Sequence, residues 1–155
     1  MDAVAAVSKP GGRRFGALVH AILAVVPLDA APEQTAESAE VQARILGAPP
    51  DELEAAKRIV QDVLSHPLLQ RARDAWRAGR CRREMPMTWV EPGGVLVEGV
   101  LDLAFEDQDG WTVLDFKTDR ELGTAEEQYR RQVRIYAAAV NRATGTPAKG
   151  VIVRL

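Results

Sequence analysis

The sequence predicts an α/β domain in which a central mixed sheet of about four strands is flanked by helices on both faces. Three observations support this class. Residues 14–79 repeat apolar side chains at the spacing of α-helices. Residues 80–118 instead form three short apolar runs separated by Pro-Gly and Asp-Gly turns, which is typical of an antiparallel meander. Another helical pattern and a last strand follow, so the order is helices, three strands, a helix and a strand.

Four helices are predicted before the first strand. Their ranges are 14–26, about 32–46, 51–64 and 67–78. We expect Asp51 to be the N-cap of the third helix, and Ser65 or His66 to cap the fourth, because short polar side chains there can accept from free backbone N–H groups. Gly47 and Gly79 stand where the second and fourth helices should end.

The strands follow in the second half of the chain. Their predicted ranges are 81–90, 95–105, 111–118 and 150–155. Between the last two strands we expect a helix with Thr124 as its N-cap and Glu127 as the capping-box partner. Residues 1–13 are expected to be a flexible leader or linker, and residues 14–155 to form one domain.

The composition limits the possible functions. Lysine and arginine total 20 against 22 acidic residues, and this balance argues against a generic, strongly basic nucleic-acid binder. The single cysteine, Cys81, cannot form an internal disulfide and is expected to be a small buried hydrophobe. The most apolar run, residues 17–28, is too short to span a bilayer, and no signal-peptide cleavage site follows it. We therefore expect a cytoplasmic protein that makes no membrane contact.

Arginines are concentrated in two parts of the chain. Each of them alone is most simply a member of a solvated helix face. As a set they could form a surface that attracts phosphate groups, because the local patch matters more than the net charge. The residues concerned are Arg71, Arg73, Arg77, Arg80, Arg82 and Arg83, and later Arg130, Arg131 and Arg134.

Two acids and a lysine interrupt the second and third predicted strands. Successive strand residues point to opposite faces, so Asp115 and Lys117 share one face and Phe116 points to the other. If the two strands pair as a hairpin, Asp102 lies close to Asp115. Neighbouring carboxylates repel unless a cation lies between them, and oxygen ligands suit Mg²⁺ or Mn²⁺. A routine surface salt bridge would explain the two strands equally well. The residues expected to share the face of Asp102 are Leu96, Glu98, Val100 and Ala104.

Two helices also carry polar residues on their apolar faces. Gln132 lies on the same face as Tyr136, and an amide on such a face is expected to have a specific hydrogen-bond partner. His20 stands on the apolar face of the first helix, one turn after Gly16. A lone histidine in such a place is more often a core residue than a ligand, although the glycine indicates that another backbone approaches this face closely.

Four segments resemble a known family when taken together. The segments "GALVH", "VEGVLDLAF", "LDFKTD" and "YRRQVRIY" resemble the RecB-like branch of the PD-(D/E)xK nuclease superfamily. More narrowly, they resemble the nuclease domain at the C-terminus of AddA/UvrD-type helicase–nucleases. The resemblance runs from about Arg13 to the last strand. It implies a restriction-endonuclease-like core with αβββαβ order, and a Mg²⁺- or Mn²⁺-dependent deoxyribonuclease, an exonuclease rather than an endonuclease, in double-strand-break repair or recombination.

The resemblance also implies roles for individual residues. The implied catalytic residues are Asp102, Asp115 and Lys117. The implied metal ligands are His20, Asp102, Asp115 and the backbone carbonyl of Phe116. The implied supporting residues are Gln132, Tyr136 and Glu84. The implied DNA contacts are Arg82, Arg83, Tyr129 and Arg130.

The resemblance leaves the partners and two other interpretations open. The implied substrate is DNA, either single-stranded or a duplex end. The sequence has no Gly-x-x-x-x-Gly-Lys-Ser/Thr loop, so the motor is expected in another part of a parent chain or in a separate subunit. The abrupt ending at Leu155 is consistent with a domain excised from a longer protein. The chain could instead be a DNA-binding module that does not cleave, or a partner-docking domain that is idle when alone.

Overall fold

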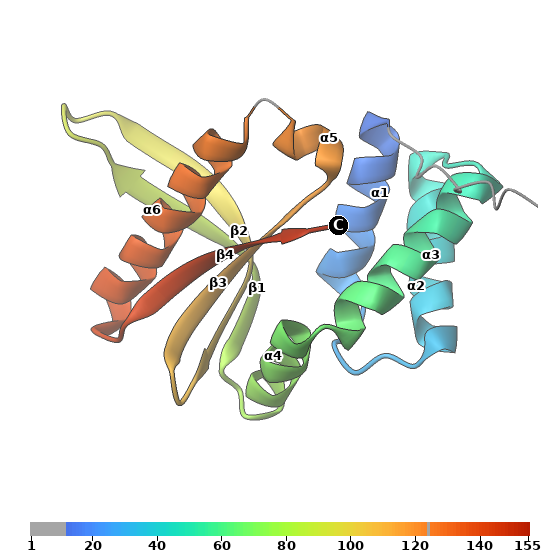
Figure 1. Ribbon diagram of the computed structural model, residues 1–155, viewed down its shortest axis with the longest axis horizontal. Coiled ribbons are helices and arrows are strands. Elements are labelled where there is room, and N and C mark those ends of the chain that lie inside the picture. The colour runs from blue at the N-terminus through green and yellow to red at the C-terminus, as the bar shows by residue number, and fades with distance from the viewer. Residues whose placement is uncertain (1–11, 124) are drawn as a thin grey trace, which may run out of the picture.

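The computed structural model describes residues 12–123 and 125–155 (Figure 1). The elements follow the predicted order, with one short helix added between the third strand and the long helix. They are α1 (Arg13–Val25), α2 (Pro32–Leu46), α3 (Pro50–Ser65), α4 (Pro67–Arg77), β1 (Cys81–Val90), β2 (Leu96–Asp107), β3 (Gly110–Lys117), α5 (Asp119–Leu122), α6 (Glu126–Thr144) and β4 (Ala148–Arg154).

The four strands form one mixed sheet, as the sequence predicted. Their order across the sheet is β1-β2-β3-β4. The β1–β2 and β2–β3 pairs are antiparallel and follow from short turns, whereas β3 and β4 are parallel. A parallel pair needs a long crossover, and α6 provides it.

Helices cover both faces of the sheet, which confirms the predicted architecture. One core lies between helices α1–α4 and the sheet, and it includes Leu103, Leu114 and Phe116. A smaller core lies under α6 and includes Val113 and Tyr136. Figure 1 shows α6 on one side of the sheet and α1–α3 on the other. The alternation of side chains along β3 therefore distributes them between two different cores.

The helix boundaries agree with the predictions except at the start of α3. This helix begins at Pro50, Pro49 occupies the N-cap position, and no side chain caps it. The prediction of Asp51 as N-cap is wrong because proline, whose φ is already helical, is favoured in the first helical position. His66 does cap α4, since its Nδ1 accepts from the N–H of Leu68 at 3.1 Å.

The start of α6 and the short helix α5 differ from the sequence prediction. Thr124 lies outside the described residues, and Ala125 holds the N-cap position of α6. The capping box occurs six residues earlier, where Thr118 caps α5 and Glu121 bonds back to the Thr118 N–H. Within the described part of the chain, no helix combines the length and apolar character that crossing a membrane would need.

The strand β2 changes the face it presents close to Asp102. Leu101 packs into the core under α6, whereas Leu103 packs against helices α1–α4. In a regular strand these two side chains would lie on one face. The prediction that Glu98 and Val100 share the face of Asp102 is therefore wrong, because the alternation breaks between them and Asp102. Both residues are exposed, Val100 by 49%.

The neighbouring strand β1 makes the same change at Glu84. Cys81 belongs to the core beneath helices α1–α4, while Met85 packs into the core under α6. Between them Glu84 has a φ of 48°, in the left-handed region that side chains other than glycine rarely adopt. In the β1–β2 register Glu84 falls opposite Asp102, so both strands turn at one level. The rest of the hairpin reaches out beside α6 (Figure 1).

The strand β2 separates from β3 at the same level. The last paired residues of the two strands are Leu103 and Leu114. Beyond them, the backbone N–H of Phe116 donates to Oδ2 of Asp102 at 2.7 Å. A side-chain carboxylate thus replaces the backbone acceptor that a continuing strand would supply. The result is a fork in the sheet with Asp102 at its base.

The only cysteine, Cys81, is buried in the core, as expected. Burial raises the pKa of its thiol to about 11, although Arg83 and Arg82 act in the opposite direction. Because the thiolate is the reactive form, we expect the folded protein at about pH 8 to react with iodoacetamide roughly 10²-fold more slowly than the urea-unfolded chain. Mass spectrometry of the alkylated fraction over time would measure this, and equal rates would show that Cys81 is accessible.

Candidate active site

Two carboxylates meet at the fork between β2 and β3. Asp102 and Asp115 interact directly, and the Asp115 side chain is only 5% exposed. Burial raises the pKa of both groups. For Asp115 the attraction of Lys117 lowers the pKa, repulsion by Asp102 raises it, and the result is about 6. For Asp102 the N–H of Phe116 partly offsets the rise. The predicted proximity of these two acids is therefore present in the structure.

Lys117 is held on the same side as Asp115 and is also largely enclosed. Its Nζ lies 3.2 Å from Asp115 Oδ2 and 3.7 Å from Glu121 Oε2, and the Tyr129 ring centroid is 4.6 Å away. Burial lowers the pKa of Lys117, but the attraction of Asp115 and Glu121 outweighs it, so the pKa is raised overall. The ammonium group is therefore charged at neutral pH. Phe116 points into the opposite core, as predicted.

Glu121 belongs to this group of residues, and the sequence analysis missed it. Its Oε1 lies 3.0 Å from Nε2 of His20, which brings α1 into the site. The signal for it was Thr118-x-x-Glu121, a capping-box pattern directly after the Asp-x-Lys strand. Gly16 of α1 lies against the same capping box, since an added Cβ would stand 3.7 Å from Thr118 Cγ2. The close approach that Gly16 indicated is thus present.

Tyr136 explains the glycine of the Gly-x-x-Asp segment. Its hydroxyl accepts from Nε2 of Gln132 at 3.0 Å, which is the specific partner expected for this amide. The same hydroxyl lies directly over Gly99, where an added Cβ would overlap it and would stand 3.2 Å from Tyr136 Cζ. Trp89 packs edge-on against the ring with centroids 5.5 Å apart. Glycine at position 99 therefore lets α6 approach the strand that carries Asp102.

Gly99→Ala is expected to destabilise the protein by about 1–3 kcal/mol, because the added methyl group displaces the Tyr136 ring. Removing the hydroxyl in Gly99→Ala/Tyr136→Phe should recover part of the loss. Urea unfolding of the two single variants and the double variant would measure the coupling. Losses that simply add would contradict the contact between these two residues.

The other predicted residues lie at different distances from the carboxylates. Glu84 is exposed at the turn of β1. Arg82 donates to the carbonyls of Gly79 and Cys81. Arg83 is half-buried and donates to the carbonyl of Leu23 near the end of α1, so that a phosphate contact would have to break this bond.

Acidic neighbours offset much of the positive charge that the arginine runs suggested. Arg71 is paired with Asp107 at 2.7 Å, and Arg130 with Glu126 at 2.8 Å. The remaining pairs are Arg73–Asp74, Arg77–Asp29, Arg131–Glu91 and Arg134–Glu127. These exposed pairs are weak individually and can exchange partners. They nevertheless reduce the local excess of positive charge on which the expected phosphate-attracting surface depends.

The carboxylates at the fork fit a divalent cation with few protein ligands. Asp115 Oδ2 is buried and accepts no hydrogen bond, and both acids carry a raised pKa, so a positive charge there would be favoured. Over residues 12–123 and 125–155, no three His, Cys, Asp or Glu side chains are grouped closely enough to hold a metal by themselves. Mg²⁺ suits such a site, because it keeps several waters and binds through one or two carboxylates together with substrate phosphates.

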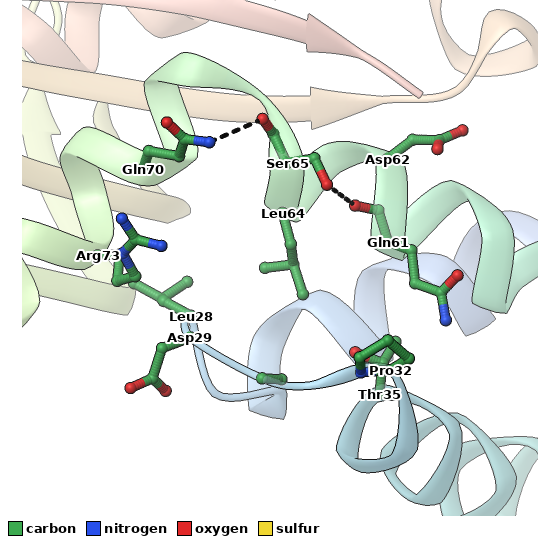
Figure 2. Close-up of a pocket in the computed structure, with 11 residues that line it drawn as sticks. Leu28, Asp29, Pro32, Thr35, Gln61, Asp62, Leu64, Ser65, Gln70 and Arg73 are labelled. Atoms are coloured by element: carbon green, nitrogen blue, oxygen red, sulfur yellow. Dashed lines mark hydrogen bonds between the residues drawn. The ribbon is translucent and has the colours of Figure 1, made fainter.

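A separate hollow lies between the α1–α2 turn and helices α2, α3 and α4 (Figure 2). Its volume is about 480 Å³. Figure 2 shows Gln70 donating to the Ser65 carbonyl and the Ser65 hydroxyl donating to the Gln61 carbonyl, at 3.3 and 2.9 Å. These bonds hold the corner between α3 and α4. None of the residues predicted for the site lines this hollow.

Comparison with known proteins identifies the family. Residues 4–155 match the family described as the PD-(D/E)XK nuclease superfamily. The chain therefore belongs to this superfamily, which confirms the resemblance found in the sequence and the restriction-endonuclease-like fold.

The relatives are much longer proteins, and those compared here share the name of an ATP-dependent helicase/nuclease subunit. The chain is 28% identical over 160 residues to the one from Bacillus velezensis, an alignment that covers 87% of this chain and 13% of that protein. It is 36% identical over 92 residues to the one from Heliobacterium modesticaldum, covering 50% of this chain and 6% of that protein. The relative from Lachnoclostridium phytofermentans is 28% identical over 114 residues, covering 70% and 8%.

Proposed function

We propose that the chain is a divalent-metal-dependent deoxyribonuclease that hydrolyses phosphodiester bonds at the fork between β2 and β3. The observation that supports this most directly is the pair of buried carboxylates beside a charged lysine. Asp102 and Asp115 both have a raised pKa, and Lys117 lies 3.2 Å from the unbonded oxygen of Asp115. Outside a functional site such an arrangement is expensive to maintain.

Asp102 and Asp115 would hold Mg²⁺ or Mn²⁺ through their free carboxylate oxygens, with the carbonyl of Phe116 as an additional ligand. When bound, the cation lowers the pKa of water and neutralises charge on the phosphate. Lys117 contributes a fixed positive charge in an enclosed place, where it can orient the attacking water or stabilise charge that develops on the phosphate. Because its pKa is raised, Lys117 acts as a charge and a donor rather than as a base.

His20, Gln132 and Tyr136 act around the two acids. In the present arrangement Nε2 of His20 is bonded to Glu121, so this nitrogen lies beside the metal site rather than in it. Tyr136 and Gln132 line the side under α6 and would hold the DNA strand or the acids in place. Glu84, Arg82, Tyr129 and Arg130 would support or extend the DNA-binding surface.

The chain would be the nuclease module of a helicase–nuclease. The curated relatives carry helicase/nuclease in their names, and the chain aligns with only 13% or less of the three described above. A motor elsewhere in a parent chain or in a separate protein would deliver single-stranded DNA or a duplex end. Exonuclease action in double-strand-break repair or recombination is the role we assign to the whole assembly.

The direct test is a cleavage assay on linear and circular DNA, single- and double-stranded, with Mg²⁺, Mn²⁺ or EDTA. We expect linear DNA to be degraded with either metal, circular DNA to be spared, and EDTA to stop the reaction. Cleavage of circular substrates would change the assignment to an endonuclease. Metal-independent DNA binding without cleavage, also after a helicase partner is added, would favour the non-catalytic DNA-binding module.

A further inference from the structure

The carboxylate of Glu121 joins three parts of the site that are distant in the sequence. Its Oε1 lies 3.0 Å from His20 Nε2, a residue 101 positions away on α1. Its Oε2 lies 3.7 Å from Lys117 Nζ on β3. The side chain is 28% exposed, so it lies at the edge of the site rather than in open solvent.

The capping box holds this carboxylate in place. Oε1 accepts from the backbone N–H of Thr118 and from the Thr118 hydroxyl, each at 3.1 Å. The N–H of Glu121 in turn donates to the Thr118 hydroxyl at 3.3 Å. Glu121 is therefore fixed relative to the end of β3, where Lys117 is the preceding residue, and it can orient groups from other elements.

The contact with Glu121 determines which ring nitrogen of His20 carries a hydrogen. Burial raises the pKa of Glu121, but the Thr118 N–H and His20 outweigh it, so the pKa is lowered overall and the group is ionised at neutral pH. An ionised carboxylate can only accept hydrogen bonds, so His20 Nε2 must be the donor. Nδ1 is the only ring nitrogen left that can present a lone pair.

We propose that Glu121 is a positioning residue of the nuclease site, which fixes His20 through Nε2–H and Lys117 through its ammonium group. It touches neither the two acids nor the phosphate that would be cleaved, and it acts through the two residues that do face them. The hydrogen-bonded carboxylate orients the histidine as such partners do for functional imidazoles elsewhere. It also keeps Lys117 from swinging away when Asp115 binds a cation. This role rests on the proposed nuclease function, whereas the Glu121–His20 contact itself does not.

The first test is nuclear magnetic resonance of the ¹⁵N-labelled, metal-free protein. The chain has two histidines, so His66→Asn assigns the ring signals and keeps a capping side chain at position 66. We expect His20 of the wild type to show a protonated Nε2, and its ring signals to move toward those of a free imidazole in Glu121→Ala. Identical His20 signals in both proteins would overturn the proposal.

The second test separates positioning from substrate binding. Glu121→Ala is expected to lower kcat by about tenfold or more, with KM for DNA within about twofold, because small displacements of catalytic groups reduce rate rather than affinity. Glu121→Gln keeps an acceptor for His20 and Thr118 and loses the charge beside Lys117, so its kcat should fall between the other two. A kcat for Glu121→Ala equal to that of the wild type would overturn the role.

Leu122→Ala is the matched control for a purely structural effect, because Leu122 is the buried anchor of α5 at 4% exposed and touches none of these polar groups. An equal loss of kcat in Leu122→Ala and Glu121→Gln would show that α5 merely needs to fold, and would also overturn the proposal. If the wild type itself does not cleave DNA, the proposed function fails, and the nuclear magnetic resonance test still decides whether Glu121 holds His20.

Discussion

Lys117→Met is expected to abolish metal-dependent cleavage of DNA, with a loss in kcat of at least about 10²–10³-fold. Methionine keeps most of the length and apolar surface of the side chain and removes only the charged donor. The ammonium group is enclosed by Asp115, Glu121 and the Tyr129 ring, so no solvent-exposed side chain can replace it. Initial rates on labelled linear DNA at saturating Mg²⁺ would measure the loss.

The matched control is Lys149→Met, an exposed lysine on β4, which should leave the rate unchanged. Circular dichroism and thermal unfolding of both variants would show that the fold is intact. Full activity of Lys117→Met in a folded protein would refute the role assigned to this lysine. Equal losses in Lys117→Met and Lys149→Met would point to general electrostatic attraction of DNA instead.

Asp115→Asn is expected to inactivate the protein and, in EDTA at neutral pH, to make it more stable. The pKa of Asp115 in the folded state is about 6, above the ordinary 3.8, so the folded protein binds this proton more tightly than the unfolded chain. The stability contributed by the group is complete below about pH 4 and is lost as the pH rises through 6. At about 1.36 kcal/mol per pKa unit, ionisation destabilises the fold by an amount on the order of 3 kcal/mol.

Asparagine has a similar size and cannot ionise, so the melting temperature of Asp115→Asn at neutral pH should exceed that of the wild type by about 5 °C or more. The difference should shrink toward about pH 4, where the wild-type carboxyl is protonated. Asp62→Asn, an exposed acid on α3, is the control and should change nothing. A lower melting temperature for Asp115→Asn at neutral pH would show that the ion pair with Lys117 outweighs the effect of burial.

The same pair of proteins reports on metal binding without any cleavage assay. A ligand that binds only the folded state raises its stability. Mg²⁺ or Mn²⁺ should therefore raise the melting temperature of the wild type and leave that of Asp115→Asn unchanged. A shift of equal size in both proteins would place the cation somewhere other than at the two carboxylates.

Regular elements could be predicted from the sequence because their periodicity is local. The apolar spacing of α1 and the alternation along β3 each depend on backbone geometry alone, and both are present in the structure. The alternation along β2 could not be followed past Asp102, because the left-handed conformation of Glu84 and the change of face opposite it depend on how two strands pack between two cores. A left-handed glutamate leaves no mark in the sequence, unlike a glycine.

The candidate site was predictable in part for the same reason. Asp115 and Lys117 lie on one regular strand, so their relative position follows from the alternation. Glu121 was missed because a four-residue helix is too short to show periodicity, and because a second Thr-x-x-Glu pattern lies six residues further on. Its contact with His20 spans 101 residues and exists only once α1 has packed beside α5.

The bond from the Phe116 N–H to Asp102 gives the two acids different constraints during evolution. Asp102 completes the backbone hydrogen bonding where β2 leaves β3, so its loss would leave a buried donor unpaired. Asp115 does no such service, and its ionised form weakens the fold. A lineage that stopped cleaving DNA would therefore gain stability by replacing Asp115 and would be selected to retain Asp102. In descendants of this chain, the residue at position 115 is the informative marker of lost activity, and an aspartate at position 102 is not evidence that the enzyme still works.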